Sequence, residues 1–167
     1  MTVLQTERLE LRRPTSAHLD DLVRMHLDPR MMETLGGLRS AEQSRGDLAR
    51  MMAHWEEHGF GLYFVHGADD GRFLGRAGLK RVHVGGRDEV EVGYSIVADA
   101  WGQGLATEAA QRLVQVAWQD LGLAELVSFT LPHNTASRRV MEKAGFAYER
   151  DGTYADLPHV FYRLRHA

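Results

Sequence analysis

The sequence contains no cysteine. This absence excludes a disulfide framework, a cysteine-based zinc site and a cysteine nucleophile. No apolar run approaches the roughly 20 residues that a membrane-spanning helix needs, and residues 1–8 lack the basic-then-apolar pattern of a signal peptide. We therefore expect a cytoplasmic protein that has no membrane partner.

Neither sign of charge is in large excess. The chain has 20 Lys and Arg residues and 23 Asp and Glu residues, which gives a net charge of −3. This balance does not favour a nucleic-acid partner, because such a partner normally requires a basic surface. A chain of 167 residues, 44% of them hydrophobic, is long enough to bury a core, and we expect one domain over residues 1–167.

The chain has nine histidines, of which His54 and His58 are four residues apart on an expected helix. This spacing can chelate zinc when further ligands are present. No additional ligand pattern accompanies the pair, so a polar helix face is the favoured interpretation. We expect no metal site.

Hydrophobic periodicity predicts alternating strands and helices. Seven strands are expected at residues 9–12, 62–65, 73–79, 89–97, 126–131, 146–149 and 160–164. Four helices are expected, and their predicted caps are Thr15 or Ser16, then Ser40 with Gln43, then the turn before Leu105, and finally Asn134. The central hairpins indicate antiparallel pairing, whereas each β-α-β passage indicates a parallel or splayed neighbour.

A glycine-rich turn, Trp101–Thr107, joins an expected strand to an expected helix. Such a turn presents unpaired backbone N–H groups at the positive end of the helix dipole, an arrangement that binds phosphate. A tight turn without a ligand is an equally good interpretation of the glycines alone. The turn contains no Gly-Lys-Ser/Thr, and Thr107 stands where a dinucleotide fingerprint would have its third small residue.

Two segments together resemble the GNAT superfamily of N-acetyltransferases. They are the turn Trp101–Ala106 and the segment from Asn134 to Phe146, which contains Asn134, Ser137 and Gly145. The element order agrees with this family over essentially the whole chain. The combination with Gly93-Tyr94 is most similar to the branch of ribosomal-protein alanine N-acetyltransferases. The resemblance implies a three-layer mixed α/β (α+β) fold with a mostly antiparallel seven-stranded sheet, splayed between its fourth and fifth strands, and about four helices.

The resemblance also implies that acetyl-CoA binds where the sheet splays. Backbone groups of Ile96 and Val97 would pair with the pantetheine arm as an added strand does, and Asn134 would contact the same arm. Trp101 stands where many members of the family have Arg or Gln, so it does not supply a positive charge. The expected coenzyme A-binding residues are Ile96, Val97, Trp101, Gly102, Gln103, Gly104, Leu105, Ala106, Thr107, Asn134, Ser137, Arg138 and Lys143.

Four residues are candidates for the chemistry. Glu91 and Glu149 are candidate general bases, although either carboxylate can equally be a solvated strand residue. Ser137 is a candidate for assisting the departing thiolate, and the alternative is that it bonds its own helix terminus. Tyr94 is a further candidate acid, although an aromatic residue on a central strand is commonly part of the core.

The sequence therefore predicts an acetyl-CoA-dependent N-acetyltransferase. The expected reaction is direct transfer to a primary amine in a ternary complex, because no cysteine is present to form an acyl-enzyme. The acceptor is a peptide N-terminus or a small-molecule amine. Alternatives are a non-catalytic acyl-CoA-binding domain and an enzyme that uses another donor such as succinyl-CoA. The expected strand at 160–164 is interpreted as a sheet edge suited to homodimer pairing.

Overall fold

The computed structural model describes residues 3–167, and Met1 and Thr2 of the expected domain lie outside the described residues. One mixed sheet has the strand order β1-β2-β3-β4-β5-β6-β8-β7. Neighbouring strands are antiparallel except β5 and β6, which are parallel and share a single register pair, Glu91 with Val127. The strands are β1 (Val3–Gln5), β2 (Leu9–Arg12), β3 (Leu62–Gly67), β4 (Phe73–Val84), β5 (Arg87–Ile96), β6 (Glu125–Thr130), β7 (Ala147–Tyr154) and β8 (Leu157–Arg165).

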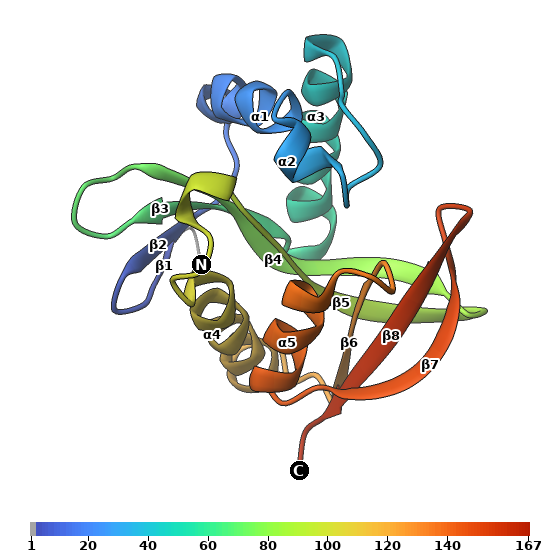
Figure 1. The fold of residues 1–167 in the computed structure, drawn as a ribbon. Helices are drawn as coiled ribbons and strands as arrows, with labels where there is room; N and C mark the ends of the chain where they lie inside the picture. Colours follow the sequence, from blue (N-terminus) through green and yellow to red (C-terminus); the bar gives the residue numbers. More distant parts are fainter. Residues whose placement is uncertain (1–2) are drawn as a thin grey trace.

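Helices cover both faces of this sheet. Figure 1 shows α1, α2 and α3 grouped on one side and α4 and α5 on the other. The bounds are α1 (Leu19–His26), α2 (Pro29–Met32), α3 (Ala41–His58), α4 (Leu105–Gln119) and α5 (Thr135–Lys143). None of the helices in residues 3–167 combines the length and the apolar character that crossing a bilayer requires.

Local sequence signals account for the helix ends. Ser40 and Gln43 form the expected capping box of α3, and Gly59 ends that helix with a φ of 73°. The side chain of Asn134 accepts from the Ser137 N–H and so caps α5. The spacing of small and apolar residues in α4 also behaves as expected. Its buried side chains are Leu105, Ala109, Ala110, Leu113, Val116 and Ala117.

The two faces of the sheet bury separate apolar clusters. Leu79, Val92, Leu126 and Tyr162 pack with α4 and α5 in the larger cluster. A second cluster joins α1, α2 and α3 to Phe64 of β3, and a third packs Val82 and Val84 of β4 against Phe129 and Phe161. Because side chains alternate along a strand, neighbouring residues of β5 project toward different layers. This alternation separates the chemical groups described below.

The expected fold class and the splay between the 89–97 and 126–131 strands are confirmed, and three details differ. The described residues contain five α-helices rather than about four, because the short helix α2 begins at Pro29 with Asp28 as its N-cap. The described residues contain eight strands, because the short segment β1 pairs with β2 as an added edge. The expected sheet edge at 160–164 is wrong: β8 is hydrogen-bonded to β6 and to β7, so β7 forms that edge. The sequence places the closing strands correctly but does not say which of them is outermost.

Candidate active site

The site is organised around the point where β5 and β6 diverge. Glu91 and Val127 form the only register pair between these strands in residues 3–167, and the Ser128 hydroxyl donates to the Val92 carbonyl at 2.8 Å beside it. Past this join, β5 continues to Ile96 without β6 beside it. Polar backbone groups on that edge of β5 are therefore available to a ligand.

Alternation along β5 decides which backbone groups these are. The Val97 N–H donates to Leu74 of the preceding strand at 2.9 Å. Odd-numbered residues of β5 therefore direct their N–H and C=O groups toward β4, and even-numbered residues direct theirs toward β6. Tyr94 is the first even-numbered residue past the join. Its N–H is thus the first that β6 does not use.

Two of the backbone groups expected to contact pantetheine, the Ile96 carbonyl and the Val97 N–H, have hydrogen-bond partners within the protein. The Ile96 carbonyl, on the edge facing β6, accepts from the Trp101 indole Nε1–H at 2.7 Å. The Val97 N–H is engaged with β4. Trp101 is 54% exposed, so this bond to the Ile96 carbonyl lies near the surface.

The glycine-rich turn has the backbone conformation that an anion site requires. Gly102 and Gly104 both have a φ of 76°, and Gly104 is the N-cap of α4 with no side-chain cap. Within residues 3–167, the N–H groups of Gln103 and Gly104 donate to no backbone carbonyl, and the first-turn amides of α4 have no helical acceptor. The amides of Ala106 and Thr107 belong to the first turn of α4, and the Leu105 side chain is buried in the core.

Arg8 is a cation at this turn that sequence reasoning missed. Its Nη1 donates to the Gln103 carbonyl at 2.7 Å, and its Nε donates to Glu108 at 2.7 Å. The side chain is 46% exposed. Arg8 is 95 residues from Gln103 in the sequence, and only the fold brings it here, so no local signal identifies it. Arg8 therefore places a positive charge, paired with Glu108, at a turn where Trp101 carries none.

Tyr94 and Ser137 join β5 to the first turn of α5. The Tyr94 hydroxyl donates to the Ser137 carbonyl at 2.9 Å and lies 3.2 Å from the Ser137 hydroxyl. Burial raises the pKa of Tyr94 to about 12, so the phenol is protonated at neutral pH. The Ser137 hydroxyl therefore faces Tyr94, and it is the Asn134 side chain that bonds the helix terminus.

Three other expected coenzyme A residues lie on or near α5. Both ends of the Asn134 amide are engaged, because Oδ1 accepts from Ser137 and Nδ2 donates to the Thr130 hydroxyl at 3.0 Å. Arg138 donates to the Tyr162 hydroxyl and the Pro132 carbonyl. Lys143 is exposed at the end of α5, where its carbonyl accepts from Gln111 of α4 at 3.4 Å.

The two candidate bases have opposite environments. Glu91 is half-buried, and no hydrogen bond engages its carboxyl group within residues 3–167. Burial raises the pKa of Glu91 to about 7. Glu149 instead accepts from Arg163 Nε at 2.8 Å, and this bond lowers the pKa of Glu149. A carboxylate tied to an arginine is a weak base, so the geometry favours Glu91.

The histidine pair has a structural explanation. His54 Nδ1 is bonded to the Phe60 carbonyl at 2.9 Å, and Nε2 accepts from the Arg81 N–H at 3.0 Å. Both ring nitrogens are therefore occupied in joining α3 to the sheet. No group of three or more His, Asp or Glu side chains arranged to hold a metal ion is present among residues 3–167.

Comparisons with known proteins agree with this geometry. A profile described as "Acetyltransferase (GNAT) domain" matches residues 8–147. The FsC-acetyl coenzyme A-N(2)-transacetylase of Aspergillus fumigatus is 31% identical over 157 residues, which cover 87% of this chain and 65% of that protein. An acetyltransferase structure from Agrobacterium tumefaciens is 26% identical, covers 99% of this chain and 95% of that one, and has a TM-score of 0.87.

A third similar structure is RimL, the ribosomal L7/L12 alpha-N-protein acetyltransferase, in complex with coenzyme A. It has a TM-score of 0.81 and covers 98% of this chain and 97% of that one. At 17% identity this likeness concerns the fold.

Proposed function

Because this chain belongs to the GNAT family of acetyltransferases, whose members acetylate with acetyl-CoA, we propose that it transfers the acetyl group directly to a primary amine in a ternary complex. Glu91 acts as the general base. The observation that carries this proposal is a half-buried carboxyl group with no hydrogen-bond partner in residues 3–167 and a pKa of about 7, at the join of β5 and β6.

Glu91 and Tyr94 of β5 have different roles in the proposed reaction. Glu91 and Tyr94 are three residues apart and therefore project from opposite faces of the sheet. The amine approaches Glu91 from the α3 side, and the thioester lies on the α4–α5 side near Tyr94 and Ser137. The Tyr94 N–H stabilises the oxyanion, and the hydroxyls of Tyr94 and Ser137 hydrogen-bond to the departing thiolate.

The pKa of the amine itself favours an α-amine over a lysine as acceptor. A terminal α-amine has a pKa of about 7.7–8.0, whereas a lysine amine has a pKa near 10.4. Proton transfer from an α-ammonium group to a base of pKa about 7 is uphill by roughly one unit, but from a lysine by more than three units. At 1.36 kcal/mol per unit, deprotonation of the α-amine costs about 3–4 kcal/mol less than deprotonation of the lysine.

A thiol-release assay tests this proposal. Acetyl-CoA is offered with a panel of small amines and of peptides that begin with Ala, Ser or Met, while thermal shift reports coenzyme A binding. We expect thiol release with an amine acceptor and intersecting initial-rate patterns, as a ternary complex gives. Stabilisation by coenzyme A without turnover on any amine would instead support a non-catalytic acyl-CoA-binding domain.

Substituting Gly104 with alanine is expected to weaken coenzyme A binding by about 10-fold or more, because φ of 76° is strained for a residue with a Cβ and the turn must relax away from its anion-binding shape. The strain also costs stability, about 1–2 kcal/mol. Titration with coenzyme A measures the affinity. Gly122→Ala is the matched control, since Gly122 has a φ of 62° with open space around it beyond the far end of α4. Equal loss of affinity in both variants would refute the assignment of the turn.

Substituting Arg8 with methionine is expected to weaken coenzyme A binding by about 3- to 10-fold, since one charge-assisted contact to phosphate is lost at an exposed position. The difference from the wild type shrinks as salt is added. Adding Glu108→Gln to this variant recovers part of the affinity, because Glu108 loses its partner Arg8 and its charge then repels phosphate. An unchanged affinity in Arg8→Met would place the phosphates elsewhere.

A further inference from the structure

Arg76 on β4 is a cation without a counterion. It is half-buried, and within residues 3–167 no hydrogen bond or ion pair engages its guanidinium group. Burial and the nearby Arg39 lower the pKa of Arg76 to about 10. An arginine held away from water without a partner costs free energy. Proteins commonly keep such an unpaired buried cation where a ligand supplies the missing negative charge.

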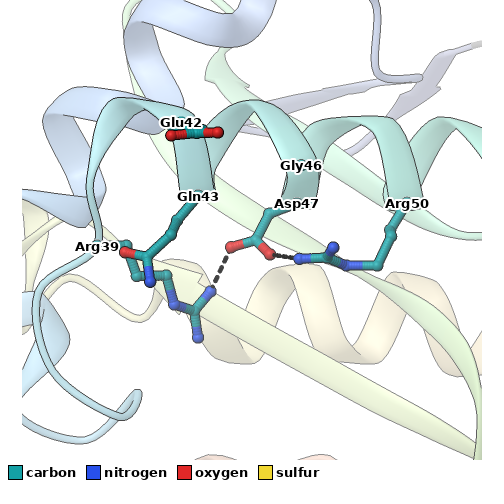
Figure 2. A pocket seen from close by; sticks show the side chains of 6 residues that line it. All are labelled: Arg39, Glu42, Gln43, Gly46, Asp47 and Arg50. Carbon is teal, nitrogen blue, oxygen red and sulfur yellow. Dashed lines mark hydrogen bonds and ion pairs between the residues drawn. The ribbon is translucent and has the colours of Figure 1, made fainter.

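Of the two carboxylates whose charge reaches Arg76, Asp47 and Glu91, Asp47 is paired with other arginines. Asp47 of α3 accepts from Arg39 Nη1 at 2.7 Å and also from Arg50. Figure 2 shows the Arg39 and Arg50 side chains reaching Asp47 from its two sides. These residues line an open pocket of about 500 Å³ at the start of α3. Arg76 is not among the residues that line this pocket, but the charges of Arg39 and Asp47 shift its pKa.

The sheet register places Arg76 on the same face as the proposed base. Glu91 is opposite Lys80 in the β4–β5 ladder, and Arg76 is four residues before Lys80 on the same strand. Alternation therefore directs Arg76, Lys80 and Glu91 toward the α3 side of the sheet. The charge of Arg76 also reaches Glu91 and opposes the rise of its pKa.

A small residue leaves room between the two groups. Gly93 lies between Glu91 and Ser95, the residue opposite Arg76. A Cβ at Gly93 would meet nothing closer than the Glu91 carboxyl group at 3.7 Å. A ligand can therefore lie over Gly93, with one end at Glu91 and the other at Arg76. Four residues of strand span roughly 13 Å, and the long arginine side chain shortens the distance between the charges.

We propose that Arg76 binds an anionic group of the acceptor, so that the preferred acceptor is a primary amine that carries a carboxylate or phosphate several bonds from the reacting nitrogen. This inference rests on the proposed function, because Glu91 defines where the amine lies. Arg76 is on the α3 side of the sheet, whereas the phosphate-binding turn opens α4 on the other side. The anion that it binds therefore belongs to the acceptor rather than to coenzyme A.

The test compares acceptors that differ only in one charge. The peptide pair is Ala-Glu-Ala and Ala-Gln-Ala, both amidated at the C-terminus, and the small-molecule pair is 6-aminohexanoate and its amide. We expect kcat/KM for the acid to exceed that for the amide by about 10- to 100-fold in at least one pair, as a charge-assisted hydrogen bond provides. The pair that shows the preference identifies the source of the anion as a peptide or a small molecule.

The variant Arg76→Met is expected to abolish this preference, mainly through KM for the acid, so that acid and amide react at similar rates. Arg76 also opposes the rise of the pKa of Glu91, and the effect of losing that charge on the base is common to both acceptors and cancels in the ratio of their rates. Arg76→Lys is expected to retain part of the preference. Arg45→Met is the matched control, since Arg45 is exposed on α3 and is expected to leave the preference intact. Coenzyme A binding and thermal unfolding establish that each variant is folded, and the comparison of acid and amide in the wild type needs no variant.

Equal rates with acid and amide in the wild type would overturn the inference and leave the proposed function standing. An acid preference that survives in Arg76→Met would also overturn it. A third contrary outcome is that Arg76→Met selectively loses activity with succinyl-CoA, which would assign Arg76 to the acyl group. Absence of thiol release with every acceptor would contradict the proposed function itself and remove the basis of the inference with it.

Discussion

Replacing Glu91 with glutamine is expected to lower kcat by about 10²- to 10⁴-fold, the usual contribution of a positioned general base. Coenzyme A affinity is expected to be unchanged, because Glu91 lies on the face of the sheet away from the phosphate-binding turn. Steady-state rates and a coenzyme A titration measure the two quantities separately. The matched control is Glu149→Gln, which removes the other candidate base. A large loss in that variant with little loss in Glu91→Gln would reverse the assignment.

The pH profile gives the same substitution a second readout. The base acts only when it is deprotonated, so kcat/KM of the wild type is expected to rise with pH through about 7, where burial places the pKa of Glu91. The residual kcat/KM of Glu91→Gln is expected not to rise with pH through 7. The α-amine of the acceptor titrates at a higher pH, with a pKa of about 7.7–8.0. A limb near 7 that persists in the variant would show that another group is being titrated.

Glu91→Gln is also expected to stabilise the fold at alkaline pH. The pKa of Glu91 is raised in the folded state from 4.5 to about 7, so folding favours the protonated form. The wild type therefore loses stability as the pH rises between these values. Glutamine avoids this loss, which is on the order of 1–3 kcal/mol above pH 7 for a partly exposed group. Thermal unfolding of both proteins at pH 5 and pH 8 measures the difference.

The parts of the site that could be predicted from the sequence are those whose geometry is local. Gly104 and Asn134 each end a loop and begin a helix, so their roles follow from backbone conformation and capping chemistry within a few residues. The position of Glu91 beside Gly93-Tyr94 is local in the same sense. The two helices and the strand that carry these residues lie where hydrophobic periodicity and capping residues predicted them.

The parts that could not be predicted depend on contacts that the fold creates between distant segments. Arg8 reaches the turn at Gln103 across 95 residues. Arg76 shares a face of the sheet with Glu91 only because β4 and β5 pair in one register. The sequence also could not choose between the two carboxylates. The choice between Glu91 and Glu149 depends on Arg163, whose side chain reaches Glu149 but not Glu91.

Loss of Arg163 of β8 is expected to destabilise the fold strongly. This arginine is buried and donates to Glu89 at 2.8 Å and to Glu149 at 2.8 Å, and it lies 3.1 Å from Glu125. The Glu89 side chain is only 6% exposed. Methionine at position 163 fills similar space but removes both Arg163 hydrogen bonds to the buried Glu89 carboxylate. The remaining cation is Arg87, which is 63% exposed and lies 3.7 Å from Glu89. Loss of the buried partner costs far more than an exposed ion pair contributes.

The expected loss for Arg163→Met is about 3–5 kcal/mol of unfolding free energy, which corresponds to a Tm lower by roughly 6–20 °C for a domain of this size. Arg165→Met is the matched control, because Arg165 is on the same strand and 69% exposed, and it is expected to change little. A double variant with Glu89→Met and Arg163→Met is expected to recover much of the loss, since no buried charge is then left alone. A double variant less stable than Arg163→Met would show that the ion pair itself, rather than the cost of the orphaned carboxylate, stabilises this end of the sheet.

The acid range provides an independent check of the same network. Arg163 lowers the pKa of Glu149 in the folded protein below its ordinary value of 4.5. This shift contributes stability that is present above pH 4.5 and is lost as the pH falls through the folded-state pKa. Without Arg163 the shift becomes smaller, because only Arg150 and Arg165 still lower the pKa of Glu149. The stability of Arg163→Met is therefore expected to depend less steeply on pH below 4.5. Parallel acid-unfolding curves for the two proteins would show that Glu149 draws its low pKa from another cation.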